Sequence, residues 1–446
     1  MAYQGVSCSS GYEDFPMADD SELRYQCPKL GKYVFREPYW WNPIDNGTYR
    51  GRGNKQLRID IGSENIYDFE DAYLAVDIEI KHNGIAVGPD PGYVRLANGA
   101  WNIVERARHL NNMKPIEEIY PYNLTYNKEW VLKQPADLQS NGATFAGIGT
   151  KNQREIWASE IRTYRIPIML GWINAGPFPA KYLCEKQSIE FLMADPSQCI
   201  ESNYGDLDYI VSKVELHANK LCERFPGIHN GMQHSSWEAG FAEVIRRGEY
   251  AVMFKSYDWY QNAPLVNTGD YLVPIKTRAI DKIETVFGNT LDLTNPLIDD
   301  RLLTYPKLDT VQFWIRIFDR LYPEQPVECR KEAIEAYQFY LSSVNAHALS
   351  GFPNSDPTKP DPINEQPVTV EEFNSDSFVM VTDFRSLLKT HSINPVFDTD
   401  FSRTDIRFYL RLETGTVIPP GACLYHFATS SAIIGIKDGK AYQKLN

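Results

Sequence analysis

The residues best suited to ligate a metal are the eight histidines and seven cysteines. His229 and His234 lie five positions apart in a segment with the composition of a loop, and two imidazoles in a loop can bind zinc. A zinc site needs three or four ligands, however, and no matching Cys or His pair lies near these two. No His-x-His pattern of the cupin type occurs in the chain. The spacing favours a structural role for both histidines, and we predict no metal site.

A phosphate loop and a nucleophile elbow are two further motifs that would indicate catalysis, and neither is present in complete form. Gly147-Ile148-Gly149-Thr150 has the glycines of a phosphate loop, but the lysine and following helix that cradle a phosphate are not at the required positions. No Gly-x-Ser-x-Gly nucleophile elbow occurs. His217 falls on the polar side of an alternating segment, which favours a solvated or interface role. We therefore predict no catalytic or cofactor-binding residue and expect the chain not to be an enzyme.

The cysteines indicate the redox environment. They are odd in number and form no Cys-x-x-Cys pair, which favours free thiols in a reducing compartment over a disulfide framework. The N-terminus lacks the basic start and apolar run of a signal peptide. No apolar run approaches the ~18 residues of a transmembrane helix, so we expect no membrane span. The cysteines are Cys8, Cys27, Cys184, Cys199, Cys222, Cys329 and Cys423.

Length and charge limit the class of protein. The chain has 446 residues, and single cores stop growing near ~250–300, so two cores are expected. An aromatic share of 13% is high and is typical of strand-rich packing and of contact surfaces. A formal net charge of −13 argues against a protein whose main work is to grip a phosphate backbone. Any genome contact is therefore expected to be local and weak.

Strand patterns dominate the chain and begin at Leu57 to Ile80. Apolar residues occupy every second position in Leu57–Ile61 and again from Leu74 to Ile80, which is the period of a half-buried strand. The polar segment between them predicts a loop. A third alternating segment puts Ile210, Val214, Leu216 and Ala218 on one face, and a fourth does the same with Ile406, Phe408, Leu410 and Leu412.

Short helices and long loops interrupt this pattern. Ser235 and Glu238 have the spacing of a capping box, which predicts a helix that ends near Gly248. Arg330 to Leu349 is the strongest helical pattern, with Ile334, Tyr337, Leu341 and Val344 on one face. Gln134–Gln153 and Gly351–Gln366 are rich in loop-forming residues. Residues 1–35 are small, polar and acidic, which is typical of a terminal arm or a disordered tail.

Several segments, taken in order, resemble the first jelly roll of double jelly-roll major capsid proteins. They are YDFEDAYLAVDIEI, IYPYNLTYN, YRIPIMLGWINAGPFP with IEFLMADP, and YIVSKVELHANKL. The C-terminal run TDIRFYLRLETGTVIPPGACLYHFATSSAIIGIKDGKAY is similar to the closing strands of the second jelly roll. The resemblance is to hexon-like proteins of adintoviruses, polintons and virophages, in the adenovirus and tectivirus lineage. It covers roughly two-thirds of the chain, and residues 289–366 depart from it.

The resemblance implies an all-β fold of two antiparallel jelly-roll sandwiches with short helical insertions. The divisions are an arm at 1–35, a first jelly roll at 36–225, a helical junction at 226–249 and a second jelly roll at 250–446. The last of these carries a helix and long loop near 330–366. The implied function is a structural one, in which homotrimers form pseudo-hexagonal capsomers that tile an icosahedral shell. The implied partners are other copies of the chain and virion proteins such as penton or cement proteins, with assembly in the host cytoplasm or nucleus.

Two alternatives stay open from the sequence. One is a single jelly-roll capsid protein with elaborate loops, as in small single-stranded DNA viruses, and the other is a β-sandwich that binds a receptor or carbohydrate. Particle formation separates a capsid protein from a binding protein, and the number of sandwiches separates the two capsid hypotheses. Trp40, Trp41 and the cluster Tyr257-Asp258-Trp259-Tyr260 are candidates either for subunit contacts or for ordinary packing.

Overall fold

The computed structural model of the chain describes most of its residues, in several ranges. They are 34–45, 47–82, 85–86, 93–97, 99–133, 146–147, 156, 160–223, 227–229, 232–234, 236–275, 277, 280–298, 304–317, 320–330, 332–343, 368–384 and 405–445. Of the predicted arm, residues 1–33 lie outside these ranges, and Val34 and Phe35 belong to the first strand. The predicted loop at 351–366 also lies outside them, as does nearly all of 134–153.

The first half of the chain forms a sandwich of two antiparallel sheets. One sheet has the order β1-β12-β4-β9, and the other has the order β3-β10-β7-β8. The bounds are β1 Val34–Trp41, β3 Gln56–Ile61, β4 Ile66–His82, β7 Val104–Asn111, β8 Lys114–Ile119, β9 Arg162–Pro167, β10 Gln187–Met193 and β12 Leu207–Glu223. Short strands β2 Tyr49–Arg50 and β5 Ile85–Ala86 extend the first sheet, and β6 Val94–Leu96 pairs with β11 Ile200–Ser202.

The second half repeats this arrangement. Its sheets have the orders β15-β22-β17-β20 and β16-β21-β18-β19. The bounds are β15 Ala251–Asn262, β16 Thr268–Val273, β17 Ile280–Asn289, β18 Thr310–Ile317, β19 Arg320–Glu328, β20 Met380–Asp383, β21 Ile406–Leu412 and β22 Ala422–Lys437. Strand β23 Lys440–Leu445 forms a hairpin with β22. Each half has its own hydrophobic core.

Both sandwiches are jelly rolls with the same connectivity. When the eight main strands of each half are numbered in chain order, both halves give sheets of order 1-8-3-6 and 2-7-4-5. This arrangement of two four-stranded antiparallel sheets is the jelly roll. The predicted all-β fold of two jelly rolls with short helical insertions is therefore confirmed. The second roll also rules out the single jelly-roll alternative.

The predicted loop between the first two strands is wrong over residues 66–73. Strand β4 begins at Ile66 and runs without a break to His82, and it lies in the opposite sheet from β3. Tyr67 and Phe69 are buried in the core, and Asp68 is buried beside Arg36, whose Nε lies 2.7 Å from its Oδ2. An ion pair thus keeps an acidic segment in a strand whose sequence looks turn-prone.

A bulge explains a second error, in β12. The sequence pattern puts Ile210 on the same face as Val214, yet Val211 is buried and Ile210 only half-buried. The pairing with β4 shifts register between Ser212 and Glu215, and Lys213 has a φ of 45°. The extra residue of a bulge moves every side chain beyond it to the other face. Leu216 and Ala218 are buried as predicted.

The junction between the rolls holds a hairpin, β13 Gly227–His229 with β14 Met232–His234, and helix α6 Trp237–Arg246. The predicted capping box is wrong by one residue: Ser236 is the N-cap, and its Oγ accepts from Ala239 N. Glu223 completes the cap, because its carboxylate accepts from Trp237 N at 2.8 Å and Glu238 N at 3.1 Å. Gly248, with a φ of 71°, follows the helix as predicted.

The strongest predicted helix is shorter than its pattern. Helix α8 spans Ile334–Ser343, so it begins four residues after Arg330. Tyr337 and Leu341 are buried as expected, but Ile334 is 55% exposed, and Val344 lies outside the described residues. The other helices are α1 Tyr122–Lys133, α4 Gly171–Asn174, α5 Pro196–Cys199, α7 Thr290–Leu293 and α9 Val370–Ser375, with 3-10 turns at Ala100–Ile103 and Ala180–Tyr182.

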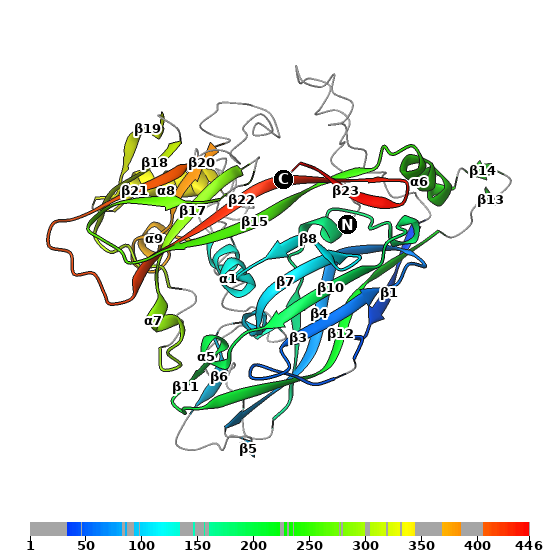
Figure 1. Ribbon diagram of the computed structural model, residues 1–446, viewed down its shortest axis with the longest axis horizontal. Coiled ribbons are helices and arrows are strands. Elements are labelled where there is room, and N and C mark those ends of the chain that lie inside the picture. The colour runs from blue at the N-terminus through cyan, green and yellow to red at the C-terminus, as the bar shows by residue number, and fades with distance from the viewer. Residues whose placement is uncertain are drawn as a thin grey trace, which may run out of the picture.

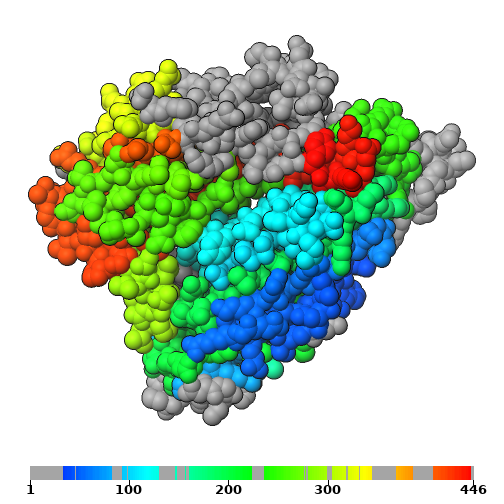
Figure 2. All heavy atoms as spheres, viewed as in Figure 1, coloured from blue at the N-terminus to red at the C-terminus, as the bar shows by residue number. Residues whose placement is uncertain are grey.

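The two rolls lie against each other along a broad seam (Figure 1). Strands β15 and β22 are long enough to serve both halves: Val252 and Ile434 pack in the first core, whereas Leu424 and Phe427 pack in the second. Strand β8 and helix α1 of the first roll lie between the two bodies, as the cyan band of Figure 2 shows. The segment after α7 also reaches the first roll, where Pro296 O accepts from Ser202 N at 2.9 Å.

Candidate assembly surface and the seam between the rolls

The described part of the chain contains no group of three or more side chains arranged to hold a metal. His229 pairs with Met232 and His234 with Gly227 in the β13–β14 hairpin, and the positions of their side chains are not described. Of the phosphate-loop candidate, only Gly147 is described, and its carbonyl accepts from Gly99 N at 3.0 Å. This hydrogen bond ties Gly147 to the residue that precedes the 3-10 turn at Ala100–Ile103.

The buried histidines are held neutral by their surroundings. Burial lowers the pKa of His109 to about 3, and its Nε2 lies 3.1 Å from Gln187 Oε1. Burial lowers the pKa of His426 to about 3 as well, and its Nδ1 lies 2.8 Å from Thr285 Oγ1. His426 Nε2 also lies 3.0 Å from Asn262 Nδ2, so the hydrogen-bond partners of the two buried imidazoles are amide and hydroxyl groups. They act as polar packing groups.

The cysteines in the described residues are free thiols, as predicted. Cys199, Cys329 and Cys423 are buried, Cys222 is half-buried, and Cys184 is exposed. Burial raises the pKa of the Cys329 thiol to about 12, which keeps it protonated and unreactive. Cys8 and Cys27 lie outside the described residues.

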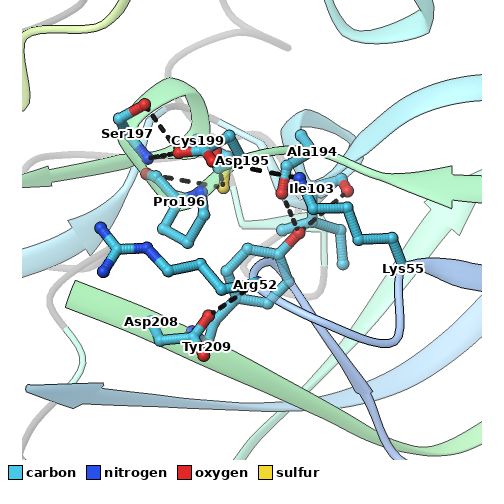
Figure 3. Close-up of polar contacts among 10 residues, drawn as sticks. All are labelled: Arg52, Lys55, Ile103, Ala194, Asp195, Pro196, Ser197, Cys199, Asp208 and Tyr209. Carbon is cyan, nitrogen blue, oxygen red and sulfur yellow. Dashed lines mark hydrogen bonds and ion pairs between the residues drawn. The ribbon is translucent and has the colours of Figure 1, made fainter. Parts of the chain in front are cut away.

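A polar cluster closes one end of the first roll (Figure 3). Asp195 is the N-cap of α5, and its Oδ1 accepts from Ser197 N at 3.0 Å and from Ser197 Oγ at 2.8 Å. The Tyr209 hydroxyl donates to Ala194 O at 2.6 Å, which ties β12 to the end of β10. The Ser197 hydroxyl is thus part of the N-cap of α5.

The loop before β3 is locked onto the same cluster. Gly51 passes so close that a Cβ there would lie 2.5 Å from Tyr209 Cε1 and 2.7 Å from Pro196. Arg52 N donates to Asp208 Oδ1 at 3.2 Å (Figure 3). Hydrogen bonds and close packing therefore link the loop before β3, helix α5 and strand β12 at this end of the roll.

Buried charges join the two rolls at the seam. The Nζ of Lys128, on α1, contacts the carboxylate of Glu284, on β17, and both side chains are almost fully buried. Lys128 Nζ also lies 2.5 Å from Glu129 Oε1, and Lys282 Nζ lies 2.5 Å from Glu284 Oε1. Two cations and two anions thus balance each other. A buried charge is tolerated only when it is paired in this way, so the register of α1 on β17 is fixed.

A second buried carboxylate, within the first roll, binds the backbone of the segment that faces the seam. Glu117, on β8, accepts from Gly171 N at 2.6 Å and from Trp172 N at 3.0 Å. Gly171 faces β15 so closely that a Cβ there would lie 2.5 Å from Lys255 O. Burial raises the pKa of Glu117 to about 7, although the two N–H groups oppose that shift. Sequence reasoning missed both Glu117 and Lys128, because neither lies in a motif.

An aromatic row crosses the outer face of the first sheet; it consists of Trp40, His217, Tyr73 and Arg165. Trp40 pairs with His217 across β1 and β12, and His217 pairs with Tyr73 across β12 and β4. The His217 ring stacks on Tyr73 at 4.8 Å and on Trp40 at 6.4 Å, and Arg165 Cζ lies 4.8 Å from the Tyr73 ring. Trp40 is 56% exposed at the end of this row.

The other residues predicted as subunit contacts differ in their burial. Trp41 is 8% exposed and packs on Tyr67 and Phe69, so it belongs to the core. Trp259 contacts Tyr425 at 5.8 Å and Tyr120 at 6.3 Å, which places it at the seam within one chain. Tyr260 is 36% exposed. Of the predicted candidates, Trp40 is the large aromatic side chain left most open to a second molecule.

No protein-family model matches the sequence, and no curated protein matches it either. Solved structures do match. A chain of the PBCV-1 virus capsid gives a TM-score of 0.60 at 8% identity, covering 94% of this chain and 99% of that one. PBCV-1 VP54, fitted into a reconstruction of the virophage Sputnik, gives 0.59 at 9% identity with the same coverages. The Faustovirus major capsid protein gives 0.53 at 9% identity, covering 93% of this chain and 92% of that one.

Proposed function

We propose that this chain, which has the double jelly-roll fold found in viral major capsid proteins, is itself a major capsid protein that assembles with copies of itself into a viral shell. The observation that carries the proposal is the fold match over nearly the whole length of both chains, 94% of this one and 99% of a PBCV-1 capsid chain. The match covers both jelly rolls at once. This chain and the PBCV-1 capsid chain therefore share the tandem arrangement of two rolls as well as the fold of each roll. The same comparisons favour a structural role over catalysis.

In the proposed assembly, three copies bring six jelly rolls into a capsomer with a pseudo-hexagonal outline, and capsomers tile an icosahedral shell. A tile must keep its two rolls at a fixed angle. The seam supports this, because Lys128 of the first roll pairs with Glu284 of the second, and Gly171 of the first roll packs closely against Lys255 O of the second. We propose the division into rolls at 36–225 and 250–446 as the units of this tile, with 226–249 as the junction and 1–35 as an arm.

The aromatic row supports self-association at the first roll. Trp40 presents a large apolar surface stacked on His217, in the same row as the cationic Arg165, and Trp and Arg are enriched where subunits meet. We propose that this row contacts a neighbouring copy of the chain. Penton or cement proteins of the virion would be further partners, and the formal net charge of −13 is compatible with weak, local genome contact.

Electron microscopy and light scattering of the purified full chain test the proposal. Trimers with a hexagonal outline, or closed shells, are expected at protein concentrations near those in an assembling particle. Monodisperse monomers under all salt and pH conditions would contradict it and would favour the remaining alternative, a β-sandwich that binds a receptor or carbohydrate. Binding of the monomer to a glycan array would support that alternative. In infected cells the protein is expected in the virion after assembly in the host cytoplasm or nucleus.

A further inference from the structure

The outer face of the β16-β21-β18-β19 sheet gathers arginines and aromatic rings. Trp314 and Tyr409 lie opposite each other on β18 and β21, with ring centres 5.2 Å apart and an angle of 4° between the planes. Arg316 lies directly opposite Arg407 in the same strand pair, and the exposed Arg411 follows further along β21. We call these five residues the arginine face. Like charges directly opposite each other destabilise a strand pair, so this face favours a nearby anion.

A carboxylate within the chain neutralises one of the three arginines. Arg407 Nη1 lies 3.0 Å from Asp270 Oδ2. Arg316 instead faces the Tyr409 ring, with its Cζ 5.9 Å from the ring centre. Arg411 lies opposite an uncharged residue on each neighbouring strand. Two guanidinium groups therefore lack a carboxylate directly across the strand.

The margin of the arginine face is apolar and acidic. Leu272 and Leu321, which are 45% and 38% exposed, lie opposite the two facing arginines from the outer strands of the sheet. Asp270 is on the edge strand β16, Glu328 ends β19, and Asp405 immediately precedes β21. The carboxylates thus lie at the edges, and the centre consists of guanidinium groups and stacked rings. Such a centre suits a peptide that carries both carboxylates and apolar side chains.

A segment of that composition occurs near the beginning of the same chain. Residues 13–22, EDFPMADDSE, contain five carboxylates and no cation, and no other ten-residue stretch of the sequence contains as many carboxylates. The segment also contains Phe15 and Met17, which can pack on aromatic rings. Arginine clusters recognise acidic peptides because each guanidinium can bind a carboxylate through two hydrogen bonds. The segment and the arginine face are therefore complementary in charge and in apolar content.

The position of this segment in the chain favours a face on a neighbouring copy. Residues 13–22 are joined to the first roll at Val34, where β1 begins. Strand β1 and the strands of the arginine face lie toward opposite ends of the long axis of the molecule (Figure 1). An extended chain from Val34 reaches at most ~40 Å to residue 22 and ~70 Å to residue 13. In a ring of six rolls, the second roll of the next copy lies beside this first roll and within that reach.

We propose that residues 13–22 of one copy dock on the arginine face of a neighbouring copy, with carboxylates on Arg316 and Arg411 and Phe15 against the aromatic rings. This inference rests on the proposed function, because it needs a neighbouring copy. Each copy donates one segment and receives one, so the contact is heterologous and is compatible with a closed ring.

A photo-cross-link in the full chain locates the docked segment. Phe15 is replaced by p-benzoylphenylalanine, the assembled protein is irradiated, and the digested product is analysed by mass spectrometry. We expect a cross-link to β16, β18 or β21 of the second roll. Isotope-labelled and unlabelled chains are mixed before assembly, so a cross-link between copies is recognised by one labelled and one unlabelled peptide.

A fluorescent peptide of residues 11–23 measures what the arginines contribute. The receiving protein is the full chain with the five carboxylates of residues 13–22 changed to amides, so that its own segment does not compete. In this background, Arg316→Gln with Arg411→Gln should weaken peptide binding by about 2- to 30-fold, the effect of two exposed ion pairs. Arg246→Gln with Arg247→Gln, at exposed arginines on α6, is the matched control and should bind the peptide normally. If the double variant does not fold, Arg411→Gln alone tests the exposed position.

The possible outcomes separate this inference from the capsid proposal. Assembled protein without a cross-link between copies, or with the cross-link outside this sheet, contradicts the inference alone. Equal peptide binding by the arginine-face variant and its control does the same. If a short single-stranded DNA displaces the peptide at a lower concentration than unlabelled peptide does, the face is a nucleic-acid site and the inference is wrong. A chain that stays monomeric contradicts both the inference and the proposed function.

Discussion

The Nζ of Lys128 in the first jelly roll contacts the carboxylate of Glu284 in the second, and both side chains are buried. The residues are 156 positions apart in the chain, so this contact exists only when both rolls have folded and docked. Lys128 Nζ also lies 5.2 Å from the centre of the Phe427 ring. The pair therefore links the two sandwiches across the seam.

Removing one partner of this pair is expected to be costly. Lys128→Met leaves Glu284 buried with less compensation, and the free energy of unfolding should fall by about 3–5 kcal/mol. Urea denaturation followed by tryptophan fluorescence measures the loss. Lys181→Met is the control: Lys181 pairs with Glu238 at the surface with a side chain 46% exposed, and its loss should be under about 1 kcal/mol. If the two substitutions lower the free energy of unfolding equally, the buried charges do not stabilise the seam.

Glu117 should make stability depend on pH near neutrality. Its pKa in the folded chain is raised from 4.5 to about 7 by burial, so the folded state binds the proton more tightly than the unfolded state does. The resulting stabilisation is complete below pH 4.5 and is lost as pH rises through 7, a change of about 3 kcal/mol. Glu117→Gln should remove this contribution. Because the buried His109 and His426 give the opposite trend in both proteins, the test is the gap between the wild-type and variant urea midpoints, which should be larger at pH 5 than at pH 8. Glu118→Gln, at an adjacent side chain that is 41% exposed, is the control and should keep it.

Trp40 and Trp41 form a matched pair with opposite expected outcomes. Trp41→Ala removes a core side chain and should destabilise the chain by about 3–5 kcal/mol. Trp40→Ala removes a side chain that is 56% exposed and should cost less than about 1 kcal/mol. If the aromatic row contacts a neighbouring copy, Trp40→Ala should weaken trimer or particle formation in light scattering at unchanged thermal stability. If the Trp40→Ala protein assembles as the wild type does, the aromatic row is not part of the interface between copies.

Gly288 tests the tightness of the second roll, and Gly240 in the junction helix serves as its comparison. Gly288→Ala forces its Cβ into the ring of Tyr425, and overpacking of this kind costs about 1–3 kcal/mol. Gly240, in helix α6, has nothing within 4 Å of an added Cβ, so Gly240→Ala should stabilise by up to about 1 kcal/mol through helix propensity. Thermal denaturation should therefore shift in opposite directions for the two variants. A neutral result at Gly288 would mean that the Tyr425 ring has room to move.

Much of the strand content follows from local chemistry. The alternation in Ile406–Leu412 places Ile406, Phe408, Leu410 and Leu412 in the core, as predicted, because successive side chains of a strand point to opposite faces. The same reasoning fails at Ile66–Tyr73 and at Ile210, where a long-range ion pair and a bulge override the local pattern. The prediction that Ile334 is buried also fails, because helical periodicity does not specify which turns of a helix pack against the core.

The sequence by itself determined that the protein is rich in half-buried strands, acidic and without a metal or nucleophile motif, because those properties depend on residue type and on spacing over a few positions. Only the tertiary structure decided that the two halves share one strand order, since their side chains differ while their connectivity agrees. It also decided which tryptophan stays exposed and which charges meet at the seam. Lys128 and Glu284 are distant in the chain, and their pairing depends on how two finished sandwiches dock.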